Sequence, residues 1–165
     1  MDVIIRPVTV SDSESLTTIY NYYIKETTSS FESESITVDM MKERIEEITK
    51  SYPYFVAETS EKEIIGYCHA KPFGKTIGYQ YSVEVTVYLK PNAKQQGVGT
   101  RLYEALERQL KSQGIKTMIA SVTAENKESV LFHQKKGYEQ AAYLKNIGFK
   151  FDRWLDVIWL QKIFS

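Results

Sequence analysis

The chain has 165 residues, of which 42% are hydrophobic and 13% aromatic, and this length and composition predict one globular domain spanning residues 1–165. Lysine plus arginine and aspartate plus glutamate each number 21, so the formal net charge is zero. This balance, without a local basic stripe, argues against nucleic-acid binding. The single cysteine, Cys68, excludes an internal disulfide and a cysteine-based zinc site, and no segment approaches the ~20 apolar residues of a membrane span. We therefore expect a soluble cytoplasmic protein that has no metal site and does not enter membranes.

The first elements along the chain are a short strand and a helix. Residues 3–5 are all apolar and predict the strand. From Ser11 or Asp12, either of which can cap a helix, apolar residues recur at helical spacing to about Lys25. A polar loop around Phe31 follows.

A second helix and a hairpin come next. The helix begins at Asp39, is amphipathic, and ends before Pro53, because the residue that precedes a proline disfavours the helical conformation. Residues 54–58 and 64–69 predict two strands joined by a charged turn, which is the pattern of a hairpin.

The second half of the chain alternates strands and helices. Residues 79–89 form the longest strand-like stretch, and the helix that follows has a leucine stripe and stops at Gly114. The remaining elements are a strand at residues 116–122, a helix at residues 126–136, and strands at residues 138–144 and 154–163. This order combines a meander with a βαβ crossover, and it predicts an α/β protein with a mixed sheet and helices on both faces.

The most informative segment, residues 84–102, is a strand, a short turn and a glycine-containing helix entry. Backbone N–H groups and the helix dipole favour an anion at a helix N-terminus, and Gly97 and Gly99 would let a phosphate approach the backbone. Two competing motifs fail, because a dinucleotide fingerprint needs a third glycine where Leu102 stands and the ATP P-loop needs Gly-Lys-Ser/Thr. An ordinary turn before a helix is the alternative interpretation.

Four features, in this order, carry a family resemblance. They are the strand with Glu84, the turn at residues 94–99, Asn126 at the next strand-to-helix connection, and His-Gln-Lys-Lys-Gly-Tyr at residues 133–138. Together they resemble the GNAT superfamily of N-acetyltransferases, whose members bind acetyl-CoA.

A narrower resemblance concerns residues 84–88, His133 and residues 148–156, which are similar to the phosphinothricin acetyltransferase group. The resemblance extends over nearly the whole chain, residues 5–159. It departs at Lys94, where relatives usually carry glutamine or arginine. Lysine can still neutralise a pyrophosphate as a point charge.

For the fold, the resemblance implies a mixed, mostly antiparallel sheet of six to seven strands with about four helices on its two faces. A V-shaped splay between the fourth and fifth strands would receive the pantetheine arm of acetyl-CoA. The arm would pair with the fourth strand, where a backbone N–H would stabilise the thioester carbonyl oxygen. The residues that the resemblance assigns to acetyl-CoA are Val87, Tyr88, Leu89, Lys94, Gln95, Gln96, Gly97, Val98, Gly99, Thr100 and Asn126.

The catalytic residues that the resemblance implies are Glu84 and His133. The amino group of an amino acid is mostly protonated at pH 7, so a base must take a proton before the amine attacks a thioester. Glu84 would lie at the floor of the active site and relay that proton through a water, unless it is a surface glutamate. His133 stands where many relatives carry a tyrosine that protonates the CoA thiolate, and it could be a base, an acid, or a surface histidine. Cys68 is expected to be a buried structural thiol rather than an acyl carrier.

The same resemblance implies residues for the binding site of the acceptor amine. The residues implied for the acceptor pocket are Phe31, Lys71, Phe73 and Tyr81, and Lys71, Lys75 or Arg153 could pair with an acceptor carboxylate or phosphinate. Relatives often form a dimer that completes this pocket, and the aromatic strand at residues 154–159 is a candidate for a homodimer interface.

We therefore expect an N-acetyltransferase that moves the acetyl group of acetyl-CoA to a small amino acid or analogue, such as phosphinothricin or methionine sulfoximine. An acetyltransferase with a protein acceptor and a non-catalytic acyl-CoA sensor are the two alternatives. The presence of both Glu84 and His133 argues against the sensor.

Overall fold

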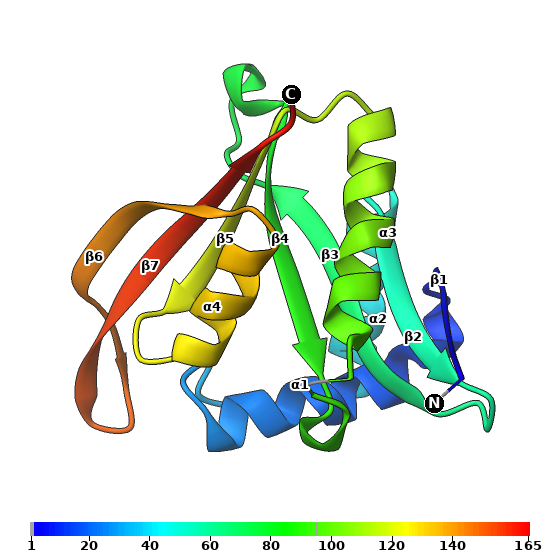
Figure 1. The fold of residues 1–165 in the computed structure, drawn as a ribbon. Coiled ribbons are helices and arrows are strands. Elements are labelled where there is room, and N and C mark those ends of the chain that lie inside the picture. Colours follow the sequence, from blue (N-terminus) through cyan, green and yellow to red (C-terminus); the bar gives the residue numbers. More distant parts are fainter. Residues whose placement is uncertain (1, 95) are drawn as a thin grey trace. The chain divides into compact units, whose positions relative to one another are not determined.

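A computed structural model of the protein describes residues 2–94 and 96–165, and its helices and strands confirm the predicted order (Figure 1). The elements are β1 (Val3–Pro7), the 3-10 turn η1 (Val10–Asp12), α1 (Ser13–Glu26), α2 (Val38–Thr49), β2 (Tyr54–Thr59), β3 (Ile64–Pro72), the 3-10 turn η2 (Ile77–Tyr79), β4 (Ser82–Leu89), the 3-10 turn η3 (Pro91–Ala93), α3 (Val98–Ser112), β5 (Thr117–Thr123), α4 (Lys127–Lys135), β6 (Glu139–Lys150) and β7 (Arg153–Ile163).

The seven strands of the described chain form one mixed sheet with the order β1-β2-β3-β4-β5-β7-β6. β4 pairs in parallel with β5, whereas β1 with β2, β2 with β3, β5 with β7 and β6 with β7 pair antiparallel. The parallel pairing joins residues 82–84 to residues 117–119. A pairing this short fits the splay expected between the fourth and fifth strands, so the predicted fold class is confirmed.

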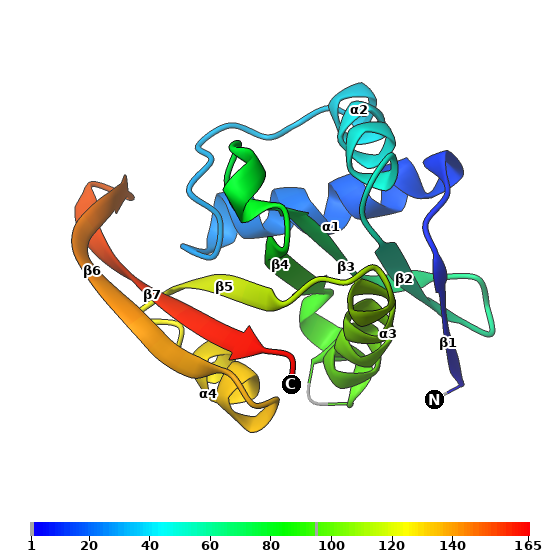
Figure 2. The ribbon, with the colours of Figure 1, turned by 90° about the horizontal axis from the view of Figure 1, so that it is seen from above.

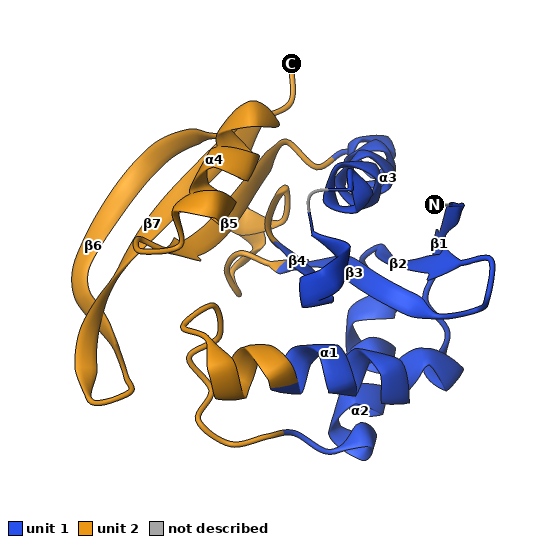
Figure 3. Cartoon of the chain, turned by 60° about the horizontal axis from the view of Figure 1, so that its bottom comes forward, with its two compact units in different colours: residues 1–21, 36–71, 86–114 blue, residues 22–35, 72–85, 115–165 orange. Residues whose placement is uncertain are grey.

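The chain contains two compact units (Figure 3). The first consists of residues 1–21, 36–71 and 86–114, and the second of residues 22–35, 72–85 and 115–165. The candidate phosphate turn belongs to the first unit, and both candidate catalytic residues belong to the second.

In the first unit, α3 packs on one face of β1 and β2, and α2 packs on the other face of β2 (Figure 2). Leu102, Leu106 and Leu110 recur at one-turn intervals along α3 and are fully buried. Gly97 before the helix and Gly114 after it have φ of +77° and +84°, in the left-handed region that glycine tolerates. The leucine stripe therefore holds α3 against the sheet, and the two glycines mark its ends.

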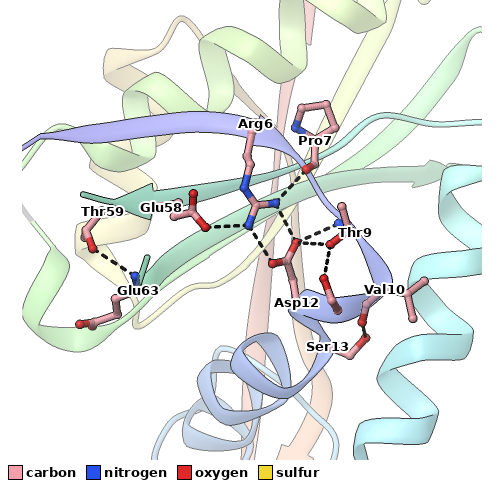
Figure 4. A network of polar contacts seen from close by, with 10 residues as sticks. Arg6, Pro7, Thr9, Val10, Asp12, Ser13, Glu58, Thr59 and Glu63 are labelled. Atoms are coloured by element: carbon pink, nitrogen blue, oxygen red, sulfur yellow. Dashed lines mark hydrogen bonds and ion pairs between the residues drawn. The ribbon is translucent and has the colours of Figure 1, made fainter. Parts of the chain in front are cut away.

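A polar network fastens β1 to η1 and β2 in the same unit (Figure 4). The Arg6 guanidinium donates to both carboxylate oxygens of Asp12, at 2.8 and 2.9 Å, and to Glu58 at 2.9 Å. The Thr9 N–H donates to Asp12 at 2.8 Å. The chain thus enters α1 through a 3-10 turn whose N-cap is Thr9, and the predicted cap Asp12 accepts bonds from Arg6 and Thr9, which both precede the turn.

In the second unit, α4 packs against β5 and β7 (Figure 1). Asn126 is its N-cap, so the helix begins where the sequence predicts. The irregular segment at residues 27–31, which follows α1, belongs to the same unit.

Several strand boundaries differ from the prediction, among them the start of β4 and the end of β6. Residues 77–79 form η2, so β4 begins at Ser82 rather than at residue 79. β6 runs well past Leu144, because its ladder with β7 shifts register there and resumes. Within the shift, the Asn146 N–H donates to the carboxylate of Asp156 at 2.8 Å. A side-chain carboxylate thus replaces the backbone carbonyl of the neighbouring strand as hydrogen-bond acceptor. The polar residues of this bulge explain why the sequence does not predict the rest of the strand.

Candidate active site

The turn between β4 and α3 presents backbone N–H groups at the start of a long helix. Gly97 is the N-cap, and a Cβ added there would meet nothing within 4 Å, so open space lies over the turn. The Arg101 N–H donates to the Gly97 carbonyl at 3.1 Å as the first bond of the helix, so the N–H groups of residues 98–100 precede the helical ladder. Lys94 is exposed on the same turn. A positive helix end, open space and a lysine fit the pyrophosphate of acetyl-CoA.

The other residues predicted for this turn differ in exposure. Val98 and Gly99 are buried in the first turn of α3, Thr100 is half-buried, and Gln96 is exposed. Gln95 lies outside the described residues. Val98 and Gly99 can therefore meet an anion only through their backbone N–H groups, whereas the half-buried Thr100 also has a hydroxyl.

The end of β4 lies against a glycine that the sequence analysis did not single out. Residues 87–89 are half-buried. A Cβ added to Gly66 of β3 would lie 2.5 Å from the Leu89 Cδ2 and 3.2 Å from the Tyr88 carbonyl oxygen. The Tyr88 ring packs beside Tyr67, with ring centroids 5.8 Å apart. Gly66 thus allows β4 to approach β3 where the pantetheine arm is predicted to pair.

Glu84 lies near the start of β4 and pairs with Ile119 of β5. Because side chains alternate along a strand, it points to the face opposite the buried Val83 and Val85. Glu84 itself is half-buried. It is therefore neither a fully exposed surface glutamate nor a core residue, and it combines contact with the protein and access to water.

His133 is buried on α4, with 3% of its surface exposed. Its Nδ1 lies 2.7 Å from the Ser129 carbonyl oxygen, so Nδ1 carries a proton and donates it. The ring packs edge-on against Phe132 and Tyr138. Burial lowers the pKa of His133 although the bond to Ser129 opposes this, so the ring is neutral near pH 7 with its lone pair on Nε2. The surface-histidine alternative is wrong.

Asn126 uses both ends of its amide within the second unit. Its Oδ1 accepts from the Ser129 N–H at 3.2 Å and caps α4, and its Nδ2 donates to the Ser29 Oγ at 3.3 Å. A ligand carbonyl oxygen only accepts, so Asn126 can meet it only with the remaining hydrogen of Nδ2.

The aromatic residues predicted for the acceptor differ in their surroundings. Phe31 and Tyr81 are exposed. Phe73 is half-buried and packs on Tyr79 and Trp159, with ring centroids 5.6 and 5.8 Å away. Phe31 and Tyr81 therefore retain surface for a ligand, and Phe73 is held by two neighbouring rings.

The basic candidates also differ. Lys71 and Lys75 are exposed. Arg153 donates to both oxygens of Glu125, at 2.8 and 2.9 Å. The guanidinium that the sequence offered to an acceptor carboxylate is thus engaged by a carboxylate of the protein itself.

Cys68 is completely buried, and its Sγ donates to the Leu102 carbonyl oxygen at 3.4 Å. Burial raises the pKa of the thiol, so it does not ionise near neutral pH. The prediction of a structural thiol is confirmed.

The described chain holds no candidate metal site and no candidate membrane-spanning helix. Its histidine, cysteine, aspartate and glutamate side chains include no group of three that could hold a metal ion. None of its helices combines the length and the apolar character that crossing a bilayer requires.

Comparison with known proteins identifies the family. The family model described as Acetyltransferase (GNAT) domain matches residues 5–159. The chain belongs to the GNAT acetyltransferases. The phosphinothricin N-acetyltransferase of Streptomyces viridochromogenes is 33% identical over 161 residues, which are 98% of this chain and 87% of that protein. The L-methionine sulfoximine/L-methionine sulfone acetyltransferase of Pseudomonas aeruginosa is 29% identical over 98% of this chain and 94% of that protein.

A solved structure agrees with the sequence comparison. It is a GNAT superfamily phosphinothricin acetyltransferase from Sinorhizobium meliloti in complex with AcCoA, which matches with a TM-score of 0.95 and 30% identity over 100% of this chain and 90% of that one. The predicted GNAT fold and family resemblance are thus confirmed. As a GNAT acetyltransferase, this chain is an N-acetyltransferase, and acetyl-CoA is its acetyl donor.

Proposed function

We propose that this GNAT enzyme acetylates the amino group of a small amino acid or analogue of the phosphinothricin or methionine sulfoximine type. Relatives that carry these two names span nearly the whole chain at 33% and 29% identity, which supports this class of acceptor. The observation that carries the chemistry is the state of His133. A buried neutral imidazole with its Nδ1–H bonded to the Ser129 carbonyl is a base in the resting enzyme.

The proposed reaction is direct attack by the amine. Bound acetyl-CoA supplies an acetyl group activated as a thioester, and the acceptor ammonium must first lose a proton. His133 is neutral, so it can accept that proton on Nε2. The C–N bond then forms and the C–S bond breaks, and the nitrogen loses a second proton, which passes through water to the departing CoA thiolate. The imidazolium of His133 afterwards returns its proton to solvent. Glu84 attracts the ammonium with its carboxylate and exchanges protons through a water. An acetyl-cysteine route is disfavoured, because the only cysteine, Cys68, is fully buried and protonated.

Three parts of the chain are assigned to acetyl-CoA. The pyrophosphate would accept hydrogen bonds from the N–H groups of residues 98–100, with Lys94 as counter-charge. Residues 87–89 would pair with the pantetheine arm, and a backbone N–H of this stretch would stabilise the thioester oxygen. Asn126 would donate to the pantetheine through Nδ2.

The proposal includes a cytoplasmic homodimer. Several large apolar side chains of the β6–β7 hairpin are exposed, and a monomer would leave them in water. They are Tyr143, Ile147, Phe149, Phe151 and Trp154. Sedimentation at several protein concentrations, for the native chain and for Trp154→Glu, tests this: a native dimer and a monomeric variant are expected, and a native monomer contradicts the dimer. A fully buried thiol also suits the reducing cytoplasm.

The function is tested by following CoA thiol release from acetyl-CoA with phosphinothricin, methionine sulfoximine, free amino acids and polyamines. We expect release with an amino-acid analogue, and a loss of about 10²–10⁴-fold in kcat for Glu84→Gln and His133→Ala with acetyl-CoA binding intact. Glu139→Gln, a change to an exposed glutamate at the start of β6, is the matched control. Release with a protein amine alone would favour the protein-acceptor alternative, and binding of acetyl-CoA without release to any amine would favour the sensor.

A further inference from the structure

The segment at residues 27–31 has no regular structure, yet a buried lysine from the far end of the chain holds it. The Lys150 Nζ donates to the Thr27 carbonyl oxygen at 2.7 Å and to the Ser30 carbonyl oxygen. Lys150 is only 6% exposed. A lysine is rarely buried to this degree unless its protons are used, and here they satisfy carbonyl groups that follow the last turn of α1.

The β5–α4 connection holds the same segment from a second direction. The Thr123 Oγ1 donates to the Thr28 carbonyl oxygen, and the Thr28 Oγ1 donates to the Glu125 Oε1, each at 2.6 Å. Glu125 is itself fixed by the two bonds from Arg153. Thr28 is polar and buried, and these bonds account for its burial.

The third contact places an aromatic ring. A Cβ added to Gly148 of β6 would lie 2.3, 2.6 and 2.9 Å from three ring atoms of Phe31. The ring of Phe31 therefore rests on the backbone of β6, and a Cβ at this position would displace it. Phe31 is nevertheless 41% exposed, so one part of the ring is fixed by the protein and another is available.

We propose that Lys150 and Glu125 are positioning residues that fix Phe31 as an apolar wall of the acceptor site and thereby set the affinity for the acceptor. This rests on the proposed function. Because this wall is already ordered, no conformational entropy is lost in ordering it when a small acceptor binds. The wall also keeps the aliphatic part of the acceptor, and therefore its amino group, in place. Neither Lys150 nor Glu125 touches the reacting atoms in this scheme; both act through segment 27–31.

The test compares Lys150→Met with Lys150→Arg and with Lys145→Met, which alters an exposed lysine of the same strand. For each variant we would measure kcat and KM for the acceptor that the native enzyme uses, the Kd for acetyl-CoA by calorimetry, and the melting temperature. We expect Lys150→Met to raise the acceptor KM roughly ten- to hundredfold, with a smaller change in the Kd for acetyl-CoA. Lys150→Arg should recover part of the loss, and Lys145→Met should behave like the native enzyme.

Gly148→Ala and Glu125→Gln provide independent variants if Lys150→Met does not fold. Gly148→Ala displaces the Phe31 ring without removing a hydrogen bond, and it should also raise the acceptor KM. Folded variants whose acceptor KM is unchanged, or whose Kd for acetyl-CoA rises as much as the acceptor KM, would overturn the positioning role. A native enzyme that acetylates none of the amines would instead reject the proposed function itself.

Discussion

The Nδ1 atom of His133 and the carbonyl oxygen of Ser129 lie 2.7 Å apart, one turn apart along α4. A carbonyl oxygen only accepts, so this contact fixes the proton on Nδ1 and leaves Nε2 as the basic nitrogen. Burial lowers the pKa of the ring below its ordinary value of about 6.5. The imidazole of His133 is therefore unprotonated at pH 7 and becomes protonated only in more acidic solution.

The first prediction follows for the pH dependence of kcat at saturating acceptor. We expect kcat to be level near pH 7 and to fall only below about pH 6.5, because the folded pKa of His133 is depressed. His133→Gln should lower kcat near pH 7 and abolish its fall in acid. If the fall in kcat has its midpoint above the ordinary histidine pKa, or persists in the variant, another group transfers the proton.

The second prediction concerns the glycines that bound α3. Gly97→Ala and Gly114→Ala both force alanine into a left-handed conformation, with φ of +77° and +84°, and neither added Cβ meets an atom within 4 Å. Each should therefore cost about 1–2 kcal/mol of stability. Only Gly97→Ala should also weaken the binding of acetyl-CoA, because only Gly97 precedes the N-terminus of α3. Thermal unfolding and calorimetry of both variants separate the two effects, and equal losses of acetyl-CoA affinity would argue against a phosphate site at this turn.

The third prediction concerns the approach of β4 to β3. Gly66→Ala would place a Cβ 2.5 Å from the Leu89 Cδ2 and 3.2 Å from the Tyr88 carbonyl oxygen, so the Leu89 side chain must turn away and the backbone at Tyr88 must give by a few tenths of an ångström. We expect a loss of about 1–3 kcal/mol in the free energy of unfolding and weaker binding of acetyl-CoA. Gly78→Ala is the control, since its Cβ would meet nothing within 4 Å and its residue is exposed. If Gly66→Ala binds acetyl-CoA like the native chain, the end of β4 does not contribute to that site.

The order of elements could be predicted because its signals are local. Leu102, Leu106 and Leu110 repeat at helical spacing, and the hairpin and the strand before the glycine turn carry their own β-type residues. The continuation of β6 could not be predicted, because it depends on a bulge whose sequence is typical of a polar loop. In that bulge the Asn146 N–H donates to Asp156 of the neighbouring strand.

The candidate site was predictable only where a motif marks it. The glycine turn and His133 belong to motifs. Lys150 instead bonds backbone carbonyl groups more than a hundred residues away, and since every residue has a carbonyl, the sequence does not indicate which ones are bonded. Likewise Gly66 and Gly148 resemble any strand glycine until the Leu89 and Phe31 side chains against them are known. The burial of His133 was also hidden, because α4 has a weakly amphipathic sequence and its packing against β5 and β7 decides which face is covered.

The last prediction concerns acid stability and His69, which is buried beside Tyr54 and Tyr67 with no hydrogen-bond partner for Nδ1 among the described residues. Burial lowers its pKa to about 3, whereas the unfolded chain has the ordinary value near 6.5. Between these values only the unfolded state binds the proton, so stability present above about pH 6.5 is lost as the pH falls, by roughly 1.4 kcal/mol per pH unit. His69→Phe removes this titration and keeps a ring, so urea unfolding from pH 7 down to pH 4 should show a shallower loss than in the native chain. An equal slope in both proteins would mean that His69 is protonated in the folded state, against the burial described here.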